Sequence, residues 1–412
     1  MTFGDQWSVN LLNLFCKLIF FIISHKVTYP IILDYYKFNT FKVIKMGKKR
    51  FFDDRLKYLS FIQNTGEKKA ISEKVYSYIA GLSDNKSYLR ILDAGTGDGT
   101  IFSNIIKSFH KHHPYSSLLI TGKEISYEDL KNTLEKMPDR FVEHPNLLIT
   151  MTNVKFSELG LIENSAKIKD KKVKEFNLVL KSNNSFDFNS QITGKLLGNF
   201  VKKNWGIEID KNDRTSYSSP CIIRVYREDN EKHLKKFLKN DYKNNNYDLI
   251  IASQAYRAAS SVNIKVKNVI GPLMRLLNKS GKLLITHSIG GSSIQKVLKI
   301  AFKGKEAFPN KAKDIIEYLK DNPFGENNIY NFSKVQTYHF KFKRAPDKTV
   351  SELFGHNTDA KWSNILYVGQ IAEKDIQAFE KNKTLQDKVR RTIDRSNDIQ
   401  FQNEIFCITK VR

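Results

Sequence analysis

A short apolar run followed by an acidic residue and alternating glycines carries the clearest chemical signal in this sequence. Leu89–Leu92 is apolar, Asp93 follows it, and Ile101–Phe109 then has the spacing of an amphipathic helix. Three glycines lie between them on alternate positions: Gly95, Gly97 and Gly99. Glycine lets the backbone approach a ligand closely or take a positive φ, and a helix N-terminus directs free N–H groups to the same point. The pattern predicts a strand, a ligand-binding turn and a helix.

The elements that must position this turn alternate between apolar strands and helical stretches. Five strands are predicted, at Leu89–Leu92, Leu118–Thr121, Leu147–Met151, Asp248–Ala252 and Lys282–His287. Helical stretches are predicted before and between them, at Phe52–Leu82, Ile101–Phe109, Tyr127–Lys136, Val266–Leu277 and Ser293–Phe302. This alternation predicts a parallel sheet with helices on both faces, and a ligand site at the carboxyl ends of the strands.

The glycine turn, residues 93–99, reads Asp-Ala-Gly-Thr-Gly-Asp-Gly and differs from the dinucleotide pattern G-x-G-x-x-G. It resembles the first motif of the class I S-adenosylmethionine-dependent methyltransferases. The resemblance implies an α/β, Rossmann-like fold with a seven-stranded, mostly parallel sheet. Val335–Lys343 and Ile405–Val411 are consistent with the antiparallel hairpin that closes such sheets. The implied cofactor is S-adenosyl-L-methionine, and the implied activity is methyl transfer.

The same resemblance assigns the cofactor to residues of the glycine turn and of the strand ends. The cofactor-binding residues expected in this way are Asp93, Gly95, Gly97, Glu124, Asp129, Asn153 and Ser253. Asp93 is expected near the methionine ammonium and Glu124, after the second strand, at the ribose hydroxyls. Asp129 is expected near the adenosine, Asn153 at the adenine, and Ser253 along the methionine portion.

The residues after the fourth strand bear on the methyl acceptor. Ser253–Tyr256 lacks the Asn/Asp-Pro-Pro-aromatic motif of methyltransferases that act on planar amines, which counts against base-amine methylation. With Gln254 in this place, the chain from about Met46 resembles the histamine N-methyltransferase family. Phe61–Glu67 and Phe401–Phe406 match two further family segments. The resemblance implies that three residues position a small amine for N-methylation: Glu67, Gln254 and Asn403.

Other interpretations of these three residues stay open. Glu67 also suits the first turn of a helix, Gln254 could cap the next helix, and Asn403 could lie in an exposed turn. The helix containing Ile294–Lys299 lacks the two tryptophans that wall the family's substrate pocket, although Val350–Phe354 resembles a pocket segment. The sequence thus favours a related amine-methylating enzyme over histamine itself. A protein or RNA methyltransferase and a non-catalytic scaffold are the alternatives.

The domain organisation expected from the sequence has four parts. Residues 1–45 form an apolar extension, interpreted as an upstream start or, alternatively, a membrane anchor. Residues 46–161 form the first part of the methyltransferase domain with a helical N-terminal cap, and residues 247–412 form the second part. Between them, residues 162–246 are expected to form a small inserted α/β subdomain. Within it, Pro220-Cys221 resembles a Pro-Cys nucleophile, but a buried structural cysteine is the favoured interpretation.

Charge and cysteine content limit the partners. The net charge of +25 suggests nucleic acid, but the lysines are scattered and no aromatic-basic signature accompanies them, so nucleic acid is not the expected partner. The three cysteines lack paired spacing, which argues against a disulfide framework or zinc site and suits a reducing compartment. We therefore expect no metal and no membrane association unless residues 1–45 are an anchor. The expected protein is a cytoplasmic monomer.

Overall fold

The computed structural model describes the residue ranges 55–83, 86–162, 167–168, 171–209, 215–234, 246–322, 329–342, 357–395 and 399–411. All of them belong to the compact unit Arg50–Arg412. The extension 1–45 and the segment Val350–Phe354 lie outside the described residues, so both remain expectations. Among the described helices, none is both long and apolar enough to cross a bilayer.

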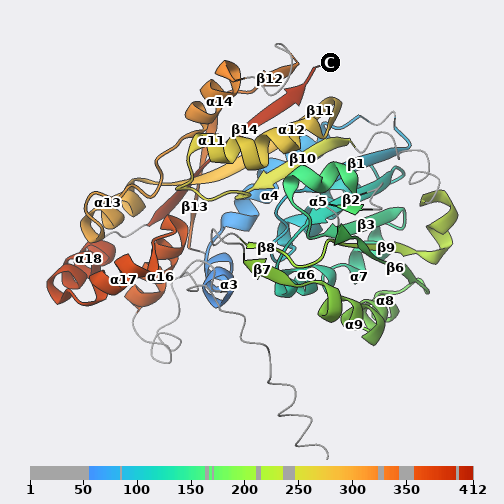
Figure 1. The fold of residues 1–412 in the computed structure, drawn as a ribbon, viewed down its shortest axis with the longest axis horizontal. Helices are drawn as coiled ribbons and strands as arrows, with labels where there is room; N and C mark the ends of the chain where they lie inside the picture. The colour runs from blue at the N-terminus through green and yellow to red at the C-terminus, as the bar shows by residue number, and fades with distance from the viewer. Residues whose placement is uncertain are drawn as a thin grey trace, which may run out of the picture. The chain divides into compact units, whose positions relative to one another are not determined.

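Ten strands within the described residues form one sheet (Figure 1). Across it the order is β12 (Tyr330–Phe332), β14 (Gln400–Lys410), β11 (Leu277–Gly290), β10 (Tyr247–Ser253), β1 (Tyr88–Asp93), β2 (Ser117–Lys123), β3 (Leu147–Thr152), β9 (Cys221–Arg227) and β6 (Lys174–Leu180), with β13 (Gln336–Lys341) also paired to β14. The five predicted strands β3, β2, β1, β10 and β11 are mutually parallel. The two late strands are antiparallel, as expected. The predicted Rossmann-like α/β fold is confirmed.

The strand count needs a correction, because three strands join the seven that were expected. One is the short β12 beside β14, and the other two, β9 and β6, come from the segment 162–246. β9 pairs antiparallel with β3, and β6 pairs parallel with β9, so both continue the main sheet. All seven residues of β9 are buried, Arg224 and Arg227 included, as in a strand covered on both faces. The segment also forms two small hairpins: β4 (Lys167–Ile168) with β5 (Lys171–Lys172), and β7 (Ile207–Ile209) with β8 (Thr215–Tyr217).

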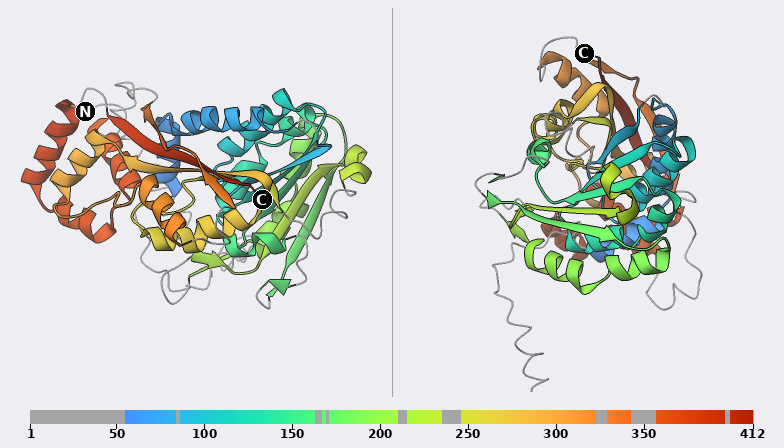
Figure 2. Two further views of the ribbon diagram at one scale, coloured as in Figure 1. Left: turned by 90° about the horizontal axis from the view of Figure 1, so that it is seen from above. Right: turned by 90° about the vertical axis from the view of Figure 1, so that its right-hand side faces the viewer.

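Helices cover both faces of the sheet (Figure 2) because alternate residues of each central strand point to opposite sides. In β10, Leu249 and Ile251 join one apolar cluster, whereas Ile250 and Ala252 join another. The first face packs against α3 (Arg55–Asn64), α4 (Glu67–Ala80), α5 (Thr100–His112), α6 (Tyr127–Leu134), α7 (Pro138–Glu143), α8 (Ser185–Ile192), α9 (Lys195–Asn204) and α13 (Ser292–Ala301). The second face packs against η2 (Phe156–Leu161), α11 (Val262–Lys265), the π-helical turn η4 (Val266–Ile270), α12 (Gly271–Arg275) and α14 (Ala312–Asp321).

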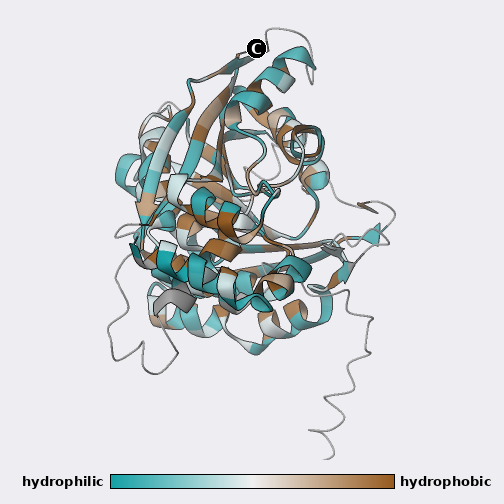
Figure 3. Cartoon of the chain, turned by 90° about the vertical axis from the view of Figure 1, so that its left-hand side faces the viewer, coloured by the Kyte–Doolittle hydropathy of each residue, from teal (hydrophilic) through white to brown (hydrophobic). Residues whose placement is uncertain are grey.

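Three helices near the C-terminal end were not predicted. They are α16 (Asn357–Gly369), α17 (Glu373–Glu380) and α18 (Lys383–Arg395), and they pack with α13 on the first face of the sheet. Figure 3 shows hydrophilic and hydrophobic residues side by side along the helices, as expected where helices cover a core. On α16, Trp362 stacks on Phe302 with ring centroids 5.9 Å apart. An aromatic contact supplied by α16 therefore lies at the C-terminal end of α13, which has no tryptophan of its own.

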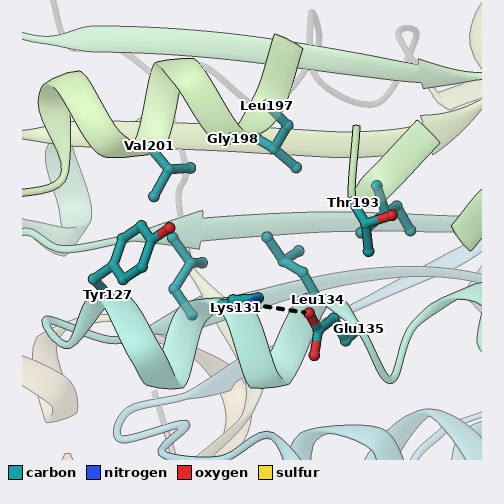
Figure 4. Close-up of a pocket in the computed structure, with 10 residues that line it drawn as sticks. Tyr127, Lys131, Leu134, Glu135, Thr193, Leu197, Gly198 and Val201 are labelled. Carbon is teal, nitrogen blue, oxygen red and sulfur yellow. Dashed lines mark ion pairs between the residues drawn. The ribbon is translucent and has the colours of Figure 1, made fainter. Parts of the chain in front are cut away.

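A cavity of about 240 Å³ separates α6 from α8 and α9 (Figure 4). Its wall is mainly apolar and consists of Tyr127, Leu130, Lys131, Leu134, Glu135, Ile192, Thr193, Leu197, Gly198 and Val201. Lys131 and Glu135 form an ion pair of 3.6 Å at the rim. A Cβ on Gly198 would have no neighbour within 4 Å, so this helical glycine leaves space unfilled.

We expect Gly198→Ala to raise the free energy of unfolding by about 1 kcal/mol, since alanine is favoured over glycine inside a helix by about that amount. Denaturant unfolding followed by far-UV circular dichroism measures the change. Gly194→Ala is the matched control, because a Cβ there would lie 3.0 Å from the Ser190 carbonyl oxygen and should give no gain. A Gly198→Ala protein no more stable than the wild type would contradict this account of the cavity.

Candidate functional site

The glycine turn lies where β1 ends and α5 begins, at the carboxyl edge of the sheet (Figure 1). Gly97 and Gly99 have φ values of +56° and +78°, in the left-handed region that favours glycine. A Cβ on Gly99 would approach Thr133 Cα to 2.6 Å, and one on Gly97 would approach the Tyr58 hydroxyl oxygen to 2.3 Å. Both backbone conformation and space therefore require glycine, as the sequence predicted for a tight ligand-binding turn.

Glu124 connects the glycine turn to the end of β2. One carboxylate oxygen accepts hydrogen bonds from the backbone N–H groups of Ile125 and Ser126, at 2.7 and 2.8 Å. The other oxygen accepts a 2.8 Å bond from the Gly97 N–H. Glu124 is thus at the predicted place, and in this structure it holds the turn itself. The contact of Glu124 with ribose hydroxyls remains a prediction. Such a contact would compete with the hydrogen bond that the Gly97 N–H donates to this carboxylate.

Asp93 is a buried carboxylate whose nearest hydrogen-bond donor among the described residues, the Gly95 N–H, is poorly aligned with it. Its exposure is 0%, and neither carboxylate oxygen forms a well-shaped hydrogen bond within the described part of the chain. Burial raises the pKa of Asp93 to about 7, although Lys68 acts in the opposite direction. Ser253, at the end of β10, likewise has a buried hydroxyl oxygen with no partner there. Unmatched polar groups beside a glycine turn fit a ligand with a cationic, hydrogen-bonding end, such as the amino-acid portion of S-adenosyl-L-methionine.

Two other expected cofactor residues differ in their placement. Asp129 is buried in the first turn of α6, close enough to Tyr58 to raise the pKa of that phenol. Asn153 is engaged elsewhere: its amide nitrogen donates to the Ser219 carbonyl at 2.9 Å, and its oxygen accepts from the Cys221 N–H at 2.8 Å. The expected adenine contact of Asn153 therefore finds no support here, because its side chain anchors the start of β9.

Cys221 lies in the environment expected of a buried structural cysteine. It is fully buried, and its thiol donates to the Asn204 carbonyl oxygen at 3.2 Å. Burial raises the pKa of this thiol to about 12. A thiol rather than a thiolate is a poor nucleophile, so the Pro220-Cys221 pair has the environment of a packing element.

The structure brings together the three residues expected at the methyl acceptor. The Gln254 amide nitrogen donates to Glu67 Oε1 at 3.1 Å, and the Asn403 amide nitrogen lies 3.5 Å from the same oxygen. Asn403 also donates to the Tyr338 hydroxyl at 3.1 Å. The Asn403 side-chain oxygen is buried and has no partner among the described residues. We call these four residues the acceptor cluster: Glu67, Gln254, Asn403 and Tyr338.

Backbone contacts hold Glu67 at this place. Glu67 is the first residue of α4, and the turn before it pairs with the end of β13, since the Gly66 N–H donates to the Lys341 carbonyl at 2.9 Å. A helix N-terminus stabilises a carboxylate, yet burial dominates and raises the pKa of Glu67, with Lys68, Asn403 and Gln254 acting against it. Glu67 therefore occupies the first turn of helix α4, where the helix dipole favours a carboxylate, and it also belongs to the acceptor cluster.

Gln254 is held in an unusual backbone conformation directly after β10. Its φ is +52°, a left-handed value that is uncommon for a residue other than glycine. The Ser288 N–H donates to the side-chain oxygen of Gln254 at 3.2 Å, while the amide nitrogen binds Glu67. Strained backbone of this kind is often found at binding and catalytic sites. Gln254 consequently spans from β11 to α4 across the end of the sheet.

The sequence reasoning missed Tyr58 and Lys68. Tyr58 on α3 accepts a 3.3 Å hydrogen bond from the Asp98 N–H of the glycine turn. Burial raises the pKa of its phenol to about 12. Lys68 on α4 has its ammonium 5.7 Å from the centre of the Tyr58 ring. The available signal was the position of Lys68 directly after Glu67, but nothing in the sequence indicated that it reaches the glycine turn.

Aromatic rings surround the acceptor cluster. Phe61 on α3 packs against Tyr367 on α16 and Phe401 on β14, with ring centroids 5.2 and 5.7 Å apart. Phe340 on β13 stacks on Phe401 at 5.1 Å. Glu67 itself is buried, and electrostatic interactions are stronger in such an environment than in water. Within the described residues, no group of three or more His, Cys, Asp or Glu side chains could hold a metal ion.

Comparison with known proteins gives similarity in fold only. No protein-family model and no curated protein sequence matches the chain. Among solved structures it is similar to a S-adenosylmethionine-dependent methyltransferase from Archaeoglobus fulgidus, at 11% identity and a TM-score of 0.28 over 83% of this chain and 94% of that one. It is also similar to PKMT2 from Rickettsia typhi, at 10% identity and a TM-score of 0.27 over 81% and 51%. Phosphoethanolamine N-methyltransferase 2 from Haemonchus contortus follows at 8% identity and a TM-score of 0.20 over 83% and 100%. These overlaps are too small to assign an activity to this chain.

We expect the affinity for S-adenosylhomocysteine to fall as the pH is lowered through about 7. The pKa of Asp93 is raised to about 7, and only its ionised form, present above that pH, attracts the ligand's ammonium. The dissociation constant should rise up to about tenfold per pH unit below the pKa. Isothermal titration calorimetry between pH 5.5 and 8 measures this. Asp93→Asn should bind more weakly without this dependence, and an equally flat wild-type profile would rule out a titrating Asp93.

Proposed function

We propose that this chain is a S-adenosyl-L-methionine-dependent methyltransferase that N-methylates a small amine. The observation that carries the proposal is the acceptor cluster. Gln254 and Asn403 follow Glu67 in the sequence by 187 and 336 positions, yet the side chains of all three meet around one carboxylate oxygen of Glu67. The residue next to Glu67, Lys68, lies against the glycine turn. The proposed donor site and the proposed acceptor site would then lie side by side.

The donor would be held by buried polar groups at the strand ends and by the backbone of the glycine turn, where Gly97 takes a positive φ. Asp93 fits the ammonium of the donor, the backbone of Gly95 and Gly97 fits its close approach, and Ser253 fits a polar atom of its methionine portion. When bound, S-adenosyl-L-methionine supplies an electrophilic methyl group on a sulfonium. Such transfer is a direct displacement, so the protein needs no covalent nucleophile.

The residues of the acceptor cluster would hold and orient the amine. The unpartnered Asn403 oxygen can accept an N–H of the substrate, and the Glu67 carboxylate can accept another or pair with a second cationic group. Because burial raises the pKa of Glu67, this carboxylate is also a better proton acceptor than an exposed one. Positioning of a nucleophile in line with the methyl carbon can lower a barrier by about 7–11 kcal/mol.

The first experiment is transfer of labelled methyl from S-adenosyl-L-methionine to histamine and a panel of imidazole and aryl-alkyl amines. We expect turnover by the wild type and a 30- to 100-fold lower kcat/KM for Glu67→Gln, since loss of a charge-assisted hydrogen bond costs about 2–3 kcal/mol. Calorimetry with S-adenosylhomocysteine shows whether each variant keeps its donor site.

Glu73→Gln is the matched control, because Glu73 lies on the same helix α4 with a side chain that is 65% exposed. It should retain wild-type kcat/KM. Equal losses in both variants would remove Glu67 from the acceptor site. Donor binding without turnover of any amine would instead favour the alternatives of a protein or RNA acceptor or of a non-catalytic scaffold.

A further inference from the structure

Lys68 is a cation placed at the glycine turn, and it forms no direct ion pair with a described residue. A Cβ on Gly97 would lie 3.9 Å from the Lys68 ammonium nitrogen. That nitrogen makes no hydrogen bond or ion pair with another residue in the described part of the chain, and it lies 5.7 Å from the centre of the Tyr58 ring. The ammonium therefore faces the region where the glycine turn would receive a ligand.

The surroundings keep Lys68 charged. Burial by itself lowers the pKa of this lysine, but the acidic groups around it outweigh burial and raise the pKa above its ordinary value; these groups are Tyr58, Glu67, Asp98 and Asp93. Of these, Asp98 already binds the side chains of Thr100 and Lys136, and Glu67 accepts from Gln254. Asp93 has only the poorly aligned Gly95 N–H as a hydrogen-bond donor among the described residues. The turn thus presents Lys68 as a cation and Asp93 as an anion, and neither forms a direct ion pair with a described residue.

This pair of charges matches the zwitterionic end of an α-amino acid. A carboxylate beside Lys68 and an ammonium beside Asp93 would satisfy both groups at once, and charge-assisted hydrogen bonds are the strongest of their kind. On the basis of the proposed function, we propose that Lys68 binds the carboxylate of the methyl donor and selects donors that carry one. Lys68 would then serve the donor while its neighbour Glu67 serves the acceptor.

The acidic character of the site makes a preference for a donor with a carboxylate a strict test of Lys68. Five carboxylates lie close enough to act on the pKa of Tyr58, Lys68 or Asp93 around the turn: Glu67, Asp93, Asp98, Glu124 and Asp129. Such a site attracts cations, and decarboxylated S-adenosylmethionine carries one more net positive charge than S-adenosyl-L-methionine. Without a cation for the carboxylate, the site should bind the decarboxylated donor at least as well. A preference for the intact donor therefore requires a group such as Lys68.

The test compares the dissociation constants of S-adenosyl-L-methionine and decarboxylated S-adenosylmethionine by isothermal titration calorimetry. We expect the wild type to bind the intact donor about 10- to 100-fold more tightly, the range typical of a charge-assisted hydrogen bond. Lys68→Met should abolish or invert this preference, and Lys68→Arg should keep most of it. Lys69→Met is the matched control, because the neighbouring Lys69 side chain is 81% exposed; it should keep the wild-type ratio.

A Lys68→Met protein that keeps the wild-type ratio overturns the assignment, and Lys68 is then only a counter-ion for the acidic residues. If Lys68→Met binds neither donor, the wild-type ratio decides, since equal affinities in the wild type also overturn it. A wild type that binds neither donor refutes the proposed function itself. The two failures are thus distinguishable.

Discussion

The buried carboxylate of Glu67 imposes the constraint on which the rest of the site depends. A carboxylate with 5% exposure is unfavourable in an apolar core unless hydrogen bonds compensate for lost water. Gln254 and Asn403 supply amide donors, and each comes from a different strand region of the sheet. Helix α4, the end of β10 and strand β14 must therefore meet with side-chain accuracy. Loss of any one partner would leave a buried charge less satisfied, which is more costly than the absence of the whole cluster.

Strand register is what allows these partners to meet. In the sheet, Asn403 on β14 lies opposite Ser288 on β11 and Tyr338 on β13, and all three take part in or contact the cluster around Glu67. The adjacent pair His287 and Glu404 faces the other side of the sheet, where the His287 ring binds the Tyr256 hydroxyl at 2.7 Å. A slip of one residue would exchange the two faces. The two polar networks therefore fix the register from both sides.

The sequence predicted the central fold well because its signals are local. The apolar strands, the glycine turn and the order of elements appear within the windows that periodicity can read, and the late antiparallel pair followed from the family resemblance. The joining of β6 and β9 to the main sheet depends on long-range pairing with β3, which no local pattern shows. The helices α16–α18 pack against α3, α13 and one another, so their presence depends on tertiary packing. The sequence predicted that three residues of the site would act together: Glu67, Gln254 and Asn403. It did not indicate Lys68 or Tyr58, because only the three-dimensional structure shows that these two side chains reach the glycine turn. Asn153 shows the reverse case: its position after β3 was foreseen, but the pairing of β9 directs its amide to Ser219 and Cys221.

The most direct test of the central claim is a crystal structure of the protein with S-adenosylhomocysteine bound. The account predicts that the ligand lies along the glycine turn with its sulfur facing the acceptor cluster, so that a methyl group on that sulfur would point toward Glu67, Gln254 and Asn403. A ligand bound elsewhere, or one at the turn with its sulfur directed away from these three residues, would contradict it.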